Sequence, residues 1–256
     1  MVAAPHLVGC YFDPDRGSRT AWSRMGRVFE ATAAAHCGSW QRAIARLQLD
    51  PSYRTTTGVV AHVHNTQKLD HWVAALEALP DGAQLLLIDA DVMILRPLDA
   101  IWDREFDLAY TTRSGHAFPF NLGVMFWRVS PRVRSFVRAW QQWNRRLFDE
   151  PGDHLAWRKR FGGVNQAAFG QLLEAGGAAE LALLELACDE WNCEESGWER
   201  FDPARTRIVH LKSALRRSIF SPHYRTAGPP ALRVLADHWR QLERDLDRAL
   251  AAAGGV

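Results

Sequence analysis

Short runs of apolar residues alternate along the chain with longer segments in which apolar residues recur at helical spacing. The expected strands span 6–12, 55–60, 84–88, 108–112 and 123–129, and the expected helices span 22–35, 65–79 and 131–147. Asn65 is expected to cap the second of these helices, which Pro80 and Gly82 end. Strands that alternate with helices favour an α/β fold with a mainly parallel central sheet flanked by helices.

The C-terminal segment at about 229–252 predicts one more helix, which is amphipathic. After Pro229 and Pro230, leucine and tryptophan side chains fall on one helical face and charged side chains on the other. We expect the apolar face to pack on a single domain that comprises residues 1–256. Formation of a homo-oligomer through this helix is the alternative.

Composition limits the class of protein. A chain of 256 residues that is 47% hydrophobic can bury one sizeable core. Its formal net charge of +2 provides no general attraction to nucleic acid or to anionic membranes. The four cysteines lack the spacing of a zinc site or a disulfide scaffold, and no apolar run approaches the length of a membrane span. We therefore expect a soluble cytoplasmic protein without a transmembrane segment.

Two acidic residues follow the apolar run at 84–88. In an extended segment the side chains alternate between faces, so Asp89 and Asp91 are expected to point the same way and Ala90 the other. Two carboxylates this close repel each other unless a cation lies between them, and Mg²⁺ and Mn²⁺ prefer such oxygen ligands. The alternative is a solvated turn, where Asp is common.

The residues around this acidic pair resemble the Asp-X-Asp segment of glycosyltransferases with the GT-A fold. Three later segments resemble the glycogenin-like and lipopolysaccharide galactosyltransferase family (family 8), and they occur in the order found in that family. Residues 120–125 are similar to the Asn-X-Gly segment of that family, and residues 162–166 are similar to its Asp-Gln segment. Residues 208–212 are similar to its late metal-binding histidine and the basic residue that follows. The resemblance extends from about residue 7 to residue 212.

The chain departs from this family at two places. Asn165 stands where the family usually has Asp, which alters the electrostatics expected near the sugar. After His210, the residues Lys212, Ser213 and Ala214 replace a Gly-X-Lys-Pro-Trp pattern, which alters the expected phosphate contacts.

The resemblance implies an enzyme that transfers a hexosyl or related sugar from a nucleotide-sugar donor to an acceptor hydroxyl with retention of the anomeric configuration. A UDP-sugar is the first candidate for the donor. It implies Mn²⁺ or Mg²⁺ as cofactor, because a divalent ion stabilises the charge that builds on the leaving diphosphate. The implied metal ligands are Asp89, Asp91 and His210. The implied donor-binding residues are Tyr11, Phe12, Asp13, Lys68, Ala90 and Lys212, and the implied catalytic residues are Gln166, Asn121 and Asn165.

Several alternatives stay open at this stage. Tyr11 and Phe12 suit a core as well as a nucleotide base, and the tryptophans of segment 189–198 suit a core as well as an acceptor sugar. One alternative is a non-catalytic module that binds nucleotide sugars. Haloacid-dehalogenase-like phosphotransferases also place Asp-X-Asp after a buried strand, but theirs lies near the N-terminus and continues into Gly-Thr or a similar pair. The acceptor is a saccharide, lipid carrier, protein, small metabolite or modified nucleic acid.

Overall fold

The chain forms two compact units in the computed structural model. The sheet unit comprises Met1–Phe12, Ser39–Asp89 and Ile101–Leu186, and the helical unit comprises Asp13–Gly38, Ala90–Ala100 and Ala187–Val256. The structure describes residues 3–12, 19–53, 60–113, 116–150, 152, 155–195, 197–220 and 230–253.

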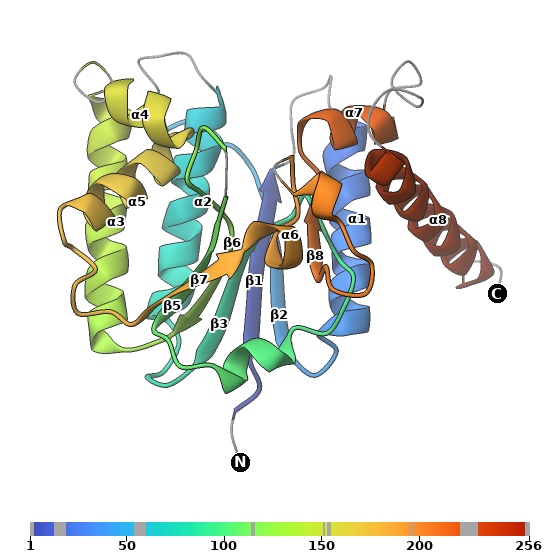
Figure 1. The fold of residues 1–256 in the computed structure, drawn as a ribbon, viewed down its shortest axis with the longest axis horizontal. Helices are drawn as coiled ribbons and strands as arrows, with labels where there is room; N and C mark the ends of the chain where they lie inside the picture. The colour runs from blue at the N-terminus through green and yellow to red at the C-terminus, as the bar shows by residue number, and fades with distance from the viewer. Residues whose placement is uncertain are drawn as a thin grey trace. The chain divides into compact units, whose positions relative to one another are not determined.

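A six-stranded sheet in the order β2-β1-β3-β6-β5-β7 forms the centre of the sheet unit (Figure 1). Strand β1 pairs in parallel with β2 and β3, whereas β6 runs antiparallel to both β3 and β5. The strands are β1 (His6–Phe12), β2 (Gln41–Leu47), β3 (Gln84–Asp89), β5 (Leu108–Thr112), β6 (Phe120–Arg128) and β7 (Leu183–Ala187).

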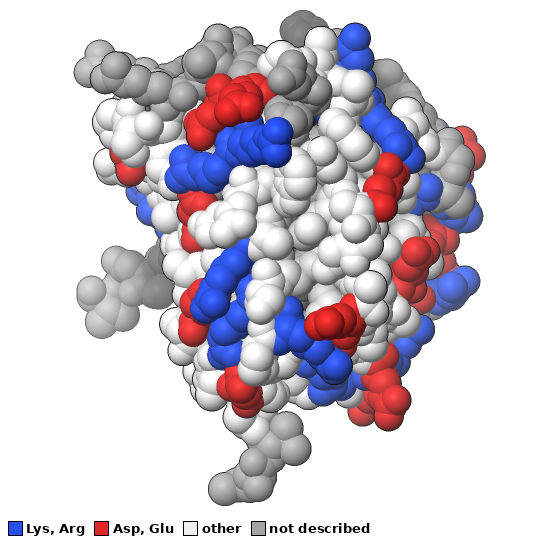
Figure 2. All heavy atoms as spheres, turned by 90° about the vertical axis from the view of Figure 1, so that its left-hand side faces the viewer, with Lys and Arg blue, Asp and Glu red and all other residues white. Residues whose placement is uncertain are grey.

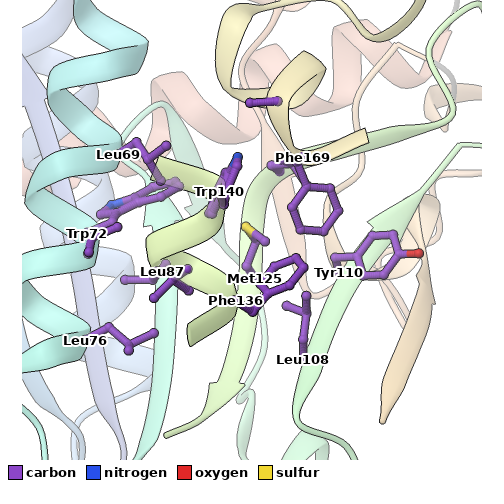
Figure 3. Close-up of a cluster of buried hydrophobic side chains, with 14 of the residues drawn as sticks. Leu69, Trp72, Leu76, Leu87, Leu108, Tyr110, Met125, Phe136, Trp140 and Phe169 are labelled. Carbon is purple, nitrogen blue, oxygen red and sulfur yellow. The ribbon is translucent and has the colours of Figure 1, made fainter. Parts of the chain in front are cut away.

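Helices α2, α3 and α5 pack against one another and against this sheet. Side chains at alternate positions of the strands, such as Leu87 and Met125, meet Trp72, Trp140 and Phe169 of these helices in one apolar core (Figure 3). The helices of the unit are α2 (Val60–Glu77), α3 (Pro131–Asp149), α4 (Leu155–Phe161) and α5 (Val164–Glu174), and the 3₁₀ helix η1 (Asp99–Asp103) leads into it.

The helical unit has its own small sheet and its own core. Strand β4 (Val92–Ile94) pairs antiparallel with β8 (Ile208–His210), and Met93 and Val209 of these strands pack with Trp239. Arg24 is ion-paired with Glu243, which joins two helices of this unit. The helices are α1 (Arg19–His36), α6 (Cys188–Trp191), η2 (Trp198–Arg200), α7 (Ser213–Phe220) and α8 (Pro230–Ala253).

The observed elements confirm the predicted α/β fold with a central sheet flanked by helices. Strands form at four of the expected places and helices at all of the expected places, and the remaining expected strand, 55–60, lies mostly outside the described residues. The C-terminal helix is α8, whose apolar side chains Leu232, Leu235 and Trp239 are buried within the helical unit. None of the described helices is both long and apolar enough to cross a bilayer.

Two sequence predictions about the region before β3 are wrong at the residues that the structure describes. Val60, expected to end a strand over 55–60, is the first residue of α2, and residues 55–59 lie outside the described part of the chain. Asn65 is therefore inside α2 and does not cap it. Strand β2 was not predicted, because its mostly exposed residues lack the continuous apolar run of a buried strand.

Arginines on α3 are held by acids of the same unit. Arg132 pairs with Asp107, Arg138 with Glu77 and Arg145 with Asp70. Figure 2 shows basic and acidic side chains interspersed on one face of the molecule, with neither sign prevailing. Nucleic-acid binding usually requires clustered and available cations, so these arginines give no support to a nucleic-acid acceptor.

Candidate functional site

Asp89 ends strand β3 and forms an ion pair with Lys68 of α2 inside the sheet unit. The Lys68 ammonium donates to Asp89 Oδ1 and also lies 4.4 Å from the centroid of the Trp72 ring. Only 11% of the Lys68 side chain and 17% of the Asp89 side chain are exposed. The carboxylate at the end of β3 is thus fixed next to a positive charge.

Asp91 is the second acid, and it lies in the helical unit just before β4. Its Oδ1 is 3.1 Å from Nε2 of His210, and its Oδ2 accepts a hydrogen bond from Arg216. Its backbone carbonyl accepts from the amide of Leu211 at 2.7 Å. Backbone and side chain are therefore both joined to the segment around β8.

The charges around Asp91 keep its carboxyl ionised. Burial alone raises the pKa of this carboxyl, but the adjacent His210, followed by Arg216 and Lys212, outweighs burial and holds the pKa well below its usual range. A buried carboxylate with this charge is a suitable oxygen ligand for a hard divalent cation.

His210 is the last residue of β8 and is fully buried. It stands opposite Val92 in the β4–β8 ladder, which brings its ring next to Asp91. Its Nδ1 is 2.9 Å from Oδ1 of Asn192. The family resemblance did not imply Asn192 as a site residue. No local pattern could have indicated Asn192, because its partner lies 18 positions away along the chain.

Asp89 and Asp91 were expected to lie on one extended segment with their side chains on the same face. This prediction is wrong, because β3 ends at Asp89 and β4 begins at Val92. The chain bends at Ala90 and Asp91 and then enters β4, which belongs to a different sheet from β3. Because a single residue separates the acids, their Cα atoms are still at most about 7 Å apart. Asp89, Asp91 and His210 each offer one ligand atom for a cation.

A tight backbone reversal follows the metal-ligand candidate His210. Ser213 has a φ of 41°, which is unusual for a residue other than glycine. The turn allows α7 to return Arg216, whose Nε donates to the Leu211 carbonyl at 2.9 Å while its guanidinium reaches Asp91. Backbone strain is thus located next to the candidate site.

Replacing Ser213 with glycine should stabilise the protein. A left-handed conformation costs an L-residue about 1–2 kcal/mol, and glycine avoids most of this cost while losing some entropy in folding. We expect Ser213→Gly to raise the free energy of unfolding by up to about 1 kcal/mol, measured by urea denaturation. Gly82→Ser, which places serine at a φ of 82°, is the reciprocal control and should lower stability. An unchanged or lower stability of Ser213→Gly would contradict this.

The three residues that the resemblance implies as catalytic, Gln166, Asn121 and Asn165, all lie in the sheet unit. Gln166 of α5 donates from Nε2 to the Phe161 carbonyl at 2.6 Å, and its Oε1 accepts from the Leu122 amide at 3.4 Å. Asn121 of β6 is fully buried and accepts at Oδ1 from the Gly123 amide. Asn165 is 4% exposed and accepts at Oδ1 from the amide of Gln166. The contact with Leu122 thus brings Gln166 beside the strand that carries Asn121.

The residues assigned to the nucleotide base lie at the end of β1. Phe12 is 5% exposed, and its ring stacks on His64 of α2 with centroids 4.4 Å apart. Tyr11 is half-buried, and Asp13 lies outside the described residues. Ala90 is 2% exposed. The tryptophans at 191 and 198 are 5% exposed each, so the core interpretation of these two residues is confirmed.

Comparison with known proteins finds similar structures but no similar sequences. No model of a protein family matches the chain, and no curated protein matches its sequence. A glycosyltransferase involved in the glycosylation of the major capsid of PBCV-1 has a TM-score of 0.57 at 11% identity, covering 93% of this chain and 100% of that chain. The glycosyltransferase GlyE of Streptococcus pneumoniae TIGR4 has a TM-score of 0.53 at 11% identity, covering 94% of this chain and 63% of that chain. The protein has the fold of these glycosyltransferases.

Proposed function

We propose that this protein is a metal-dependent glycosyltransferase that moves a sugar from a nucleotide-sugar donor to an acceptor hydroxyl. The observation that carries the proposal is the buried contact between Asp91 and His210. A second carboxylate, Asp89, lies two residues before Asp91 in the chain. The glycosyltransferase fold supports it independently. A phosphotransferase is not favoured, because the similar structures are glycosyltransferases.

Asp91 and His210 of the helical unit fit a divalent cation. Two ligand atoms bound at about 2.1 Å to one ion, at a right angle, are about 3 Å apart, which is close to the 3.1 Å between Asp91 Oδ1 and His210 Nε2. An imidazole beside carboxylates favours Mn²⁺ over Mg²⁺, which prefers oxygen ligands and water. A bound ion would act as a Lewis acid on the leaving diphosphate.

Lys68, Lys212 and Arg216 would supply positive charge for the donor phosphates. Lys68 is paired with Asp89, and Arg216 with Asp91. A cation bound by these carboxylates would take over their negative charge and leave the lysine and arginine side chains available to phosphate oxygens. The ion pairs thus hold Lys68 beside Asp89 and Arg216 beside Asp91, the two carboxylates proposed as metal ligands.

The remaining assignments follow the family resemblance. Tyr11, Phe12 and Asp13 would contact the nucleotide base, and Ala90 would contact the donor beside the acids. Gln166, Asn121 and Asn165 would orient the sugar during a transfer that retains its configuration, with a UDP-sugar as the first donor to test. Amides suit this role because they orient hydroxyls and stabilise a positive sugar carbon without acting as bases.

A thermal-shift panel of nucleoside diphosphates and nucleotide sugars, each with and without Mn²⁺, tests the proposal. A ligand present at 100 times its Kd stabilises the native state by about 2.7 kcal/mol, which raises the melting temperature measurably. We expect one nucleotide family to raise it only when Mn²⁺ is present. If no donor does so, the proposed function is wrong. A donor that binds with Mn²⁺ but is never turned over would favour the non-catalytic alternative.

A further inference from the structure

The side chain of Asn65 belongs to α2 of the sheet unit, well inside the helix. It is half-buried, and its carboxamide has no hydrogen-bond partner among the residues that the structure describes. A carboxamide has two N–H donors and one carbonyl acceptor. Asn65 therefore keeps its full capacity to bond a polar ligand.

Two glycines let this amide come close to the start of α5. A Cβ atom at Gly163 would lie 2.9 Å from Nδ2 of Asn65 and 3.4 Å from Oδ1 of Asn165. A Cβ atom at Gly162, where φ is 92°, would lie 3.2 Å from Nε2 of Gln166. Because neither position has a side chain, the amides of Asn65, Asn165 and Gln166 lie around the same turn of backbone.

Helix α2 also places Asn65 next to Lys68. The two residues are three positions apart, so they lie on the same side of the helix with their Cβ atoms about 5–6 Å apart. Lys68 is paired with Asp89 at the end of β3. Asn65 is thus close both to Lys68, proposed for the donor phosphates, and to Gln166, proposed for the donor sugar.

We propose that Asn65 is a further residue that binds the donor sugar, with its carboxamide hydrogen-bonded to a hydroxyl of the sugar that is transferred. A sugar hydroxyl both donates and accepts, as a carboxamide does. A site built to bond a hydroxyl discriminates against a sugar that lacks it. Asn65 therefore selects the sugar and does not affect binding of the nucleotide. The inference rests on the proposed function, which supplies the donor sugar.

Isothermal titration calorimetry with UDP, UDP-glucose and UDP-galactose, each with Mn²⁺, tests the proposal, with GDP and GDP-mannose run in parallel. Asn65→Ala should bind the nucleotide sugar roughly 3- to 10-fold more weakly than the wild type, the effect of one neutral hydrogen bond. It should bind the free nucleoside diphosphate as the wild type does. Unchanged affinity for every nucleotide sugar would overturn the inference, and so would an equal loss for the free diphosphate. A wild type that binds none of these ligands would overturn the proposed function as well.

Gly163→Ala is a second variant, which displaces the Asn65 amide without removing it. The φ of Gly163 is −67°, which alanine adopts readily, so the added methyl group should push aside the flexible end of the Asn65 side chain at little cost in stability. The variant should show the same loss, confined to the nucleotide sugar. The double variant Asn65→Ala/Gly163→Ala should lose no more than either single variant, whereas losses that add would contradict a shared cause.

Gln67→Ala is the matched control, because it also removes a carboxamide from α2. The Gln67 amide points elsewhere and donates to the Gln48 carbonyl at 2.7 Å. This variant should bind both the free diphosphate and the nucleotide sugar as the wild type does. A loss confined to the nucleotide sugar in Gln67→Ala would show that such selectivity is not specific to Asn65 and would count against the proposal.

Discussion

Asp91→Asn is expected to lose Mn²⁺-dependent donor binding and to reduce turnover on the order of 10³-fold. A metal ion acting as a Lewis acid contributes several kcal/mol to the transition state, and each 1.4 kcal/mol or so is a factor of ten in rate. Asparagine has nearly the same shape as aspartate but lacks the charge, so it removes the attraction for a cation. The measurement is steady-state transfer or donor hydrolysis, together with Mn²⁺ titration of both proteins.

The Asp91 result needs controls, because this carboxylate also pairs with Arg216. Removing one member of a buried ion pair leaves the other without compensation and costs stability. Melting temperatures should therefore be measured first, and turnover compared well below them. Asp89→Asn should lose Mn²⁺-dependent turnover as well, whereas Asp237→Asn, on a side chain that is 73% exposed, should not. Unchanged turnover in both the Asp89 and the Asp91 variants would eliminate the assigned metal site.

Phe169→Ala is expected to lower the free energy of unfolding by about 3–5 kcal/mol, a typical cost of truncating a buried phenylalanine. The Phe169 ring is fully buried at the centre of the sheet unit's core (Figure 3). It makes edge-to-face contacts with four aromatic rings at centroid distances of 5.3–5.7 Å, those of Tyr110, Phe120, Phe136 and Trp140. Truncation would leave a cavity and remove these contacts together.

Urea denaturation followed by circular dichroism measures the effect of Phe169→Ala. Phe169→Leu should cost less, because leucine fills more of the space than alanine does. Leu155→Ala removes a leucine side chain from a residue that is 48% exposed and should change stability by no more than about 0.5 kcal/mol. A loss below about 1 kcal/mol in Phe169→Ala would mean that the core of the sheet unit does not depend on this aromatic cluster.

Local sequence patterns determined the elements whose burial is uniform or regularly periodic. The run that forms β3 is apolar at every position from 85 to 88, because side chains on both faces of the strand are buried. Helix α3 begins at the expected Pro131, where Ser130 caps it by accepting from the Val133 amide. The position of Asp89 at the end of β3 could be predicted for the same reason.

Only the tertiary structure decided how the candidate site is held. Strand β2 was missed because its exposed residues carry little apolar signal, and its pairing with β1 is what makes it a strand. The pairing of Lys68 with Asp89 depends on how α2 packs against the sheet. Asn192 meets His210 because the bonds between Cys193 and β8 align the two segments. A sequence pattern reports the burial of its own segment, whereas contacts between distant segments depend on packing, which local periodicity does not encode.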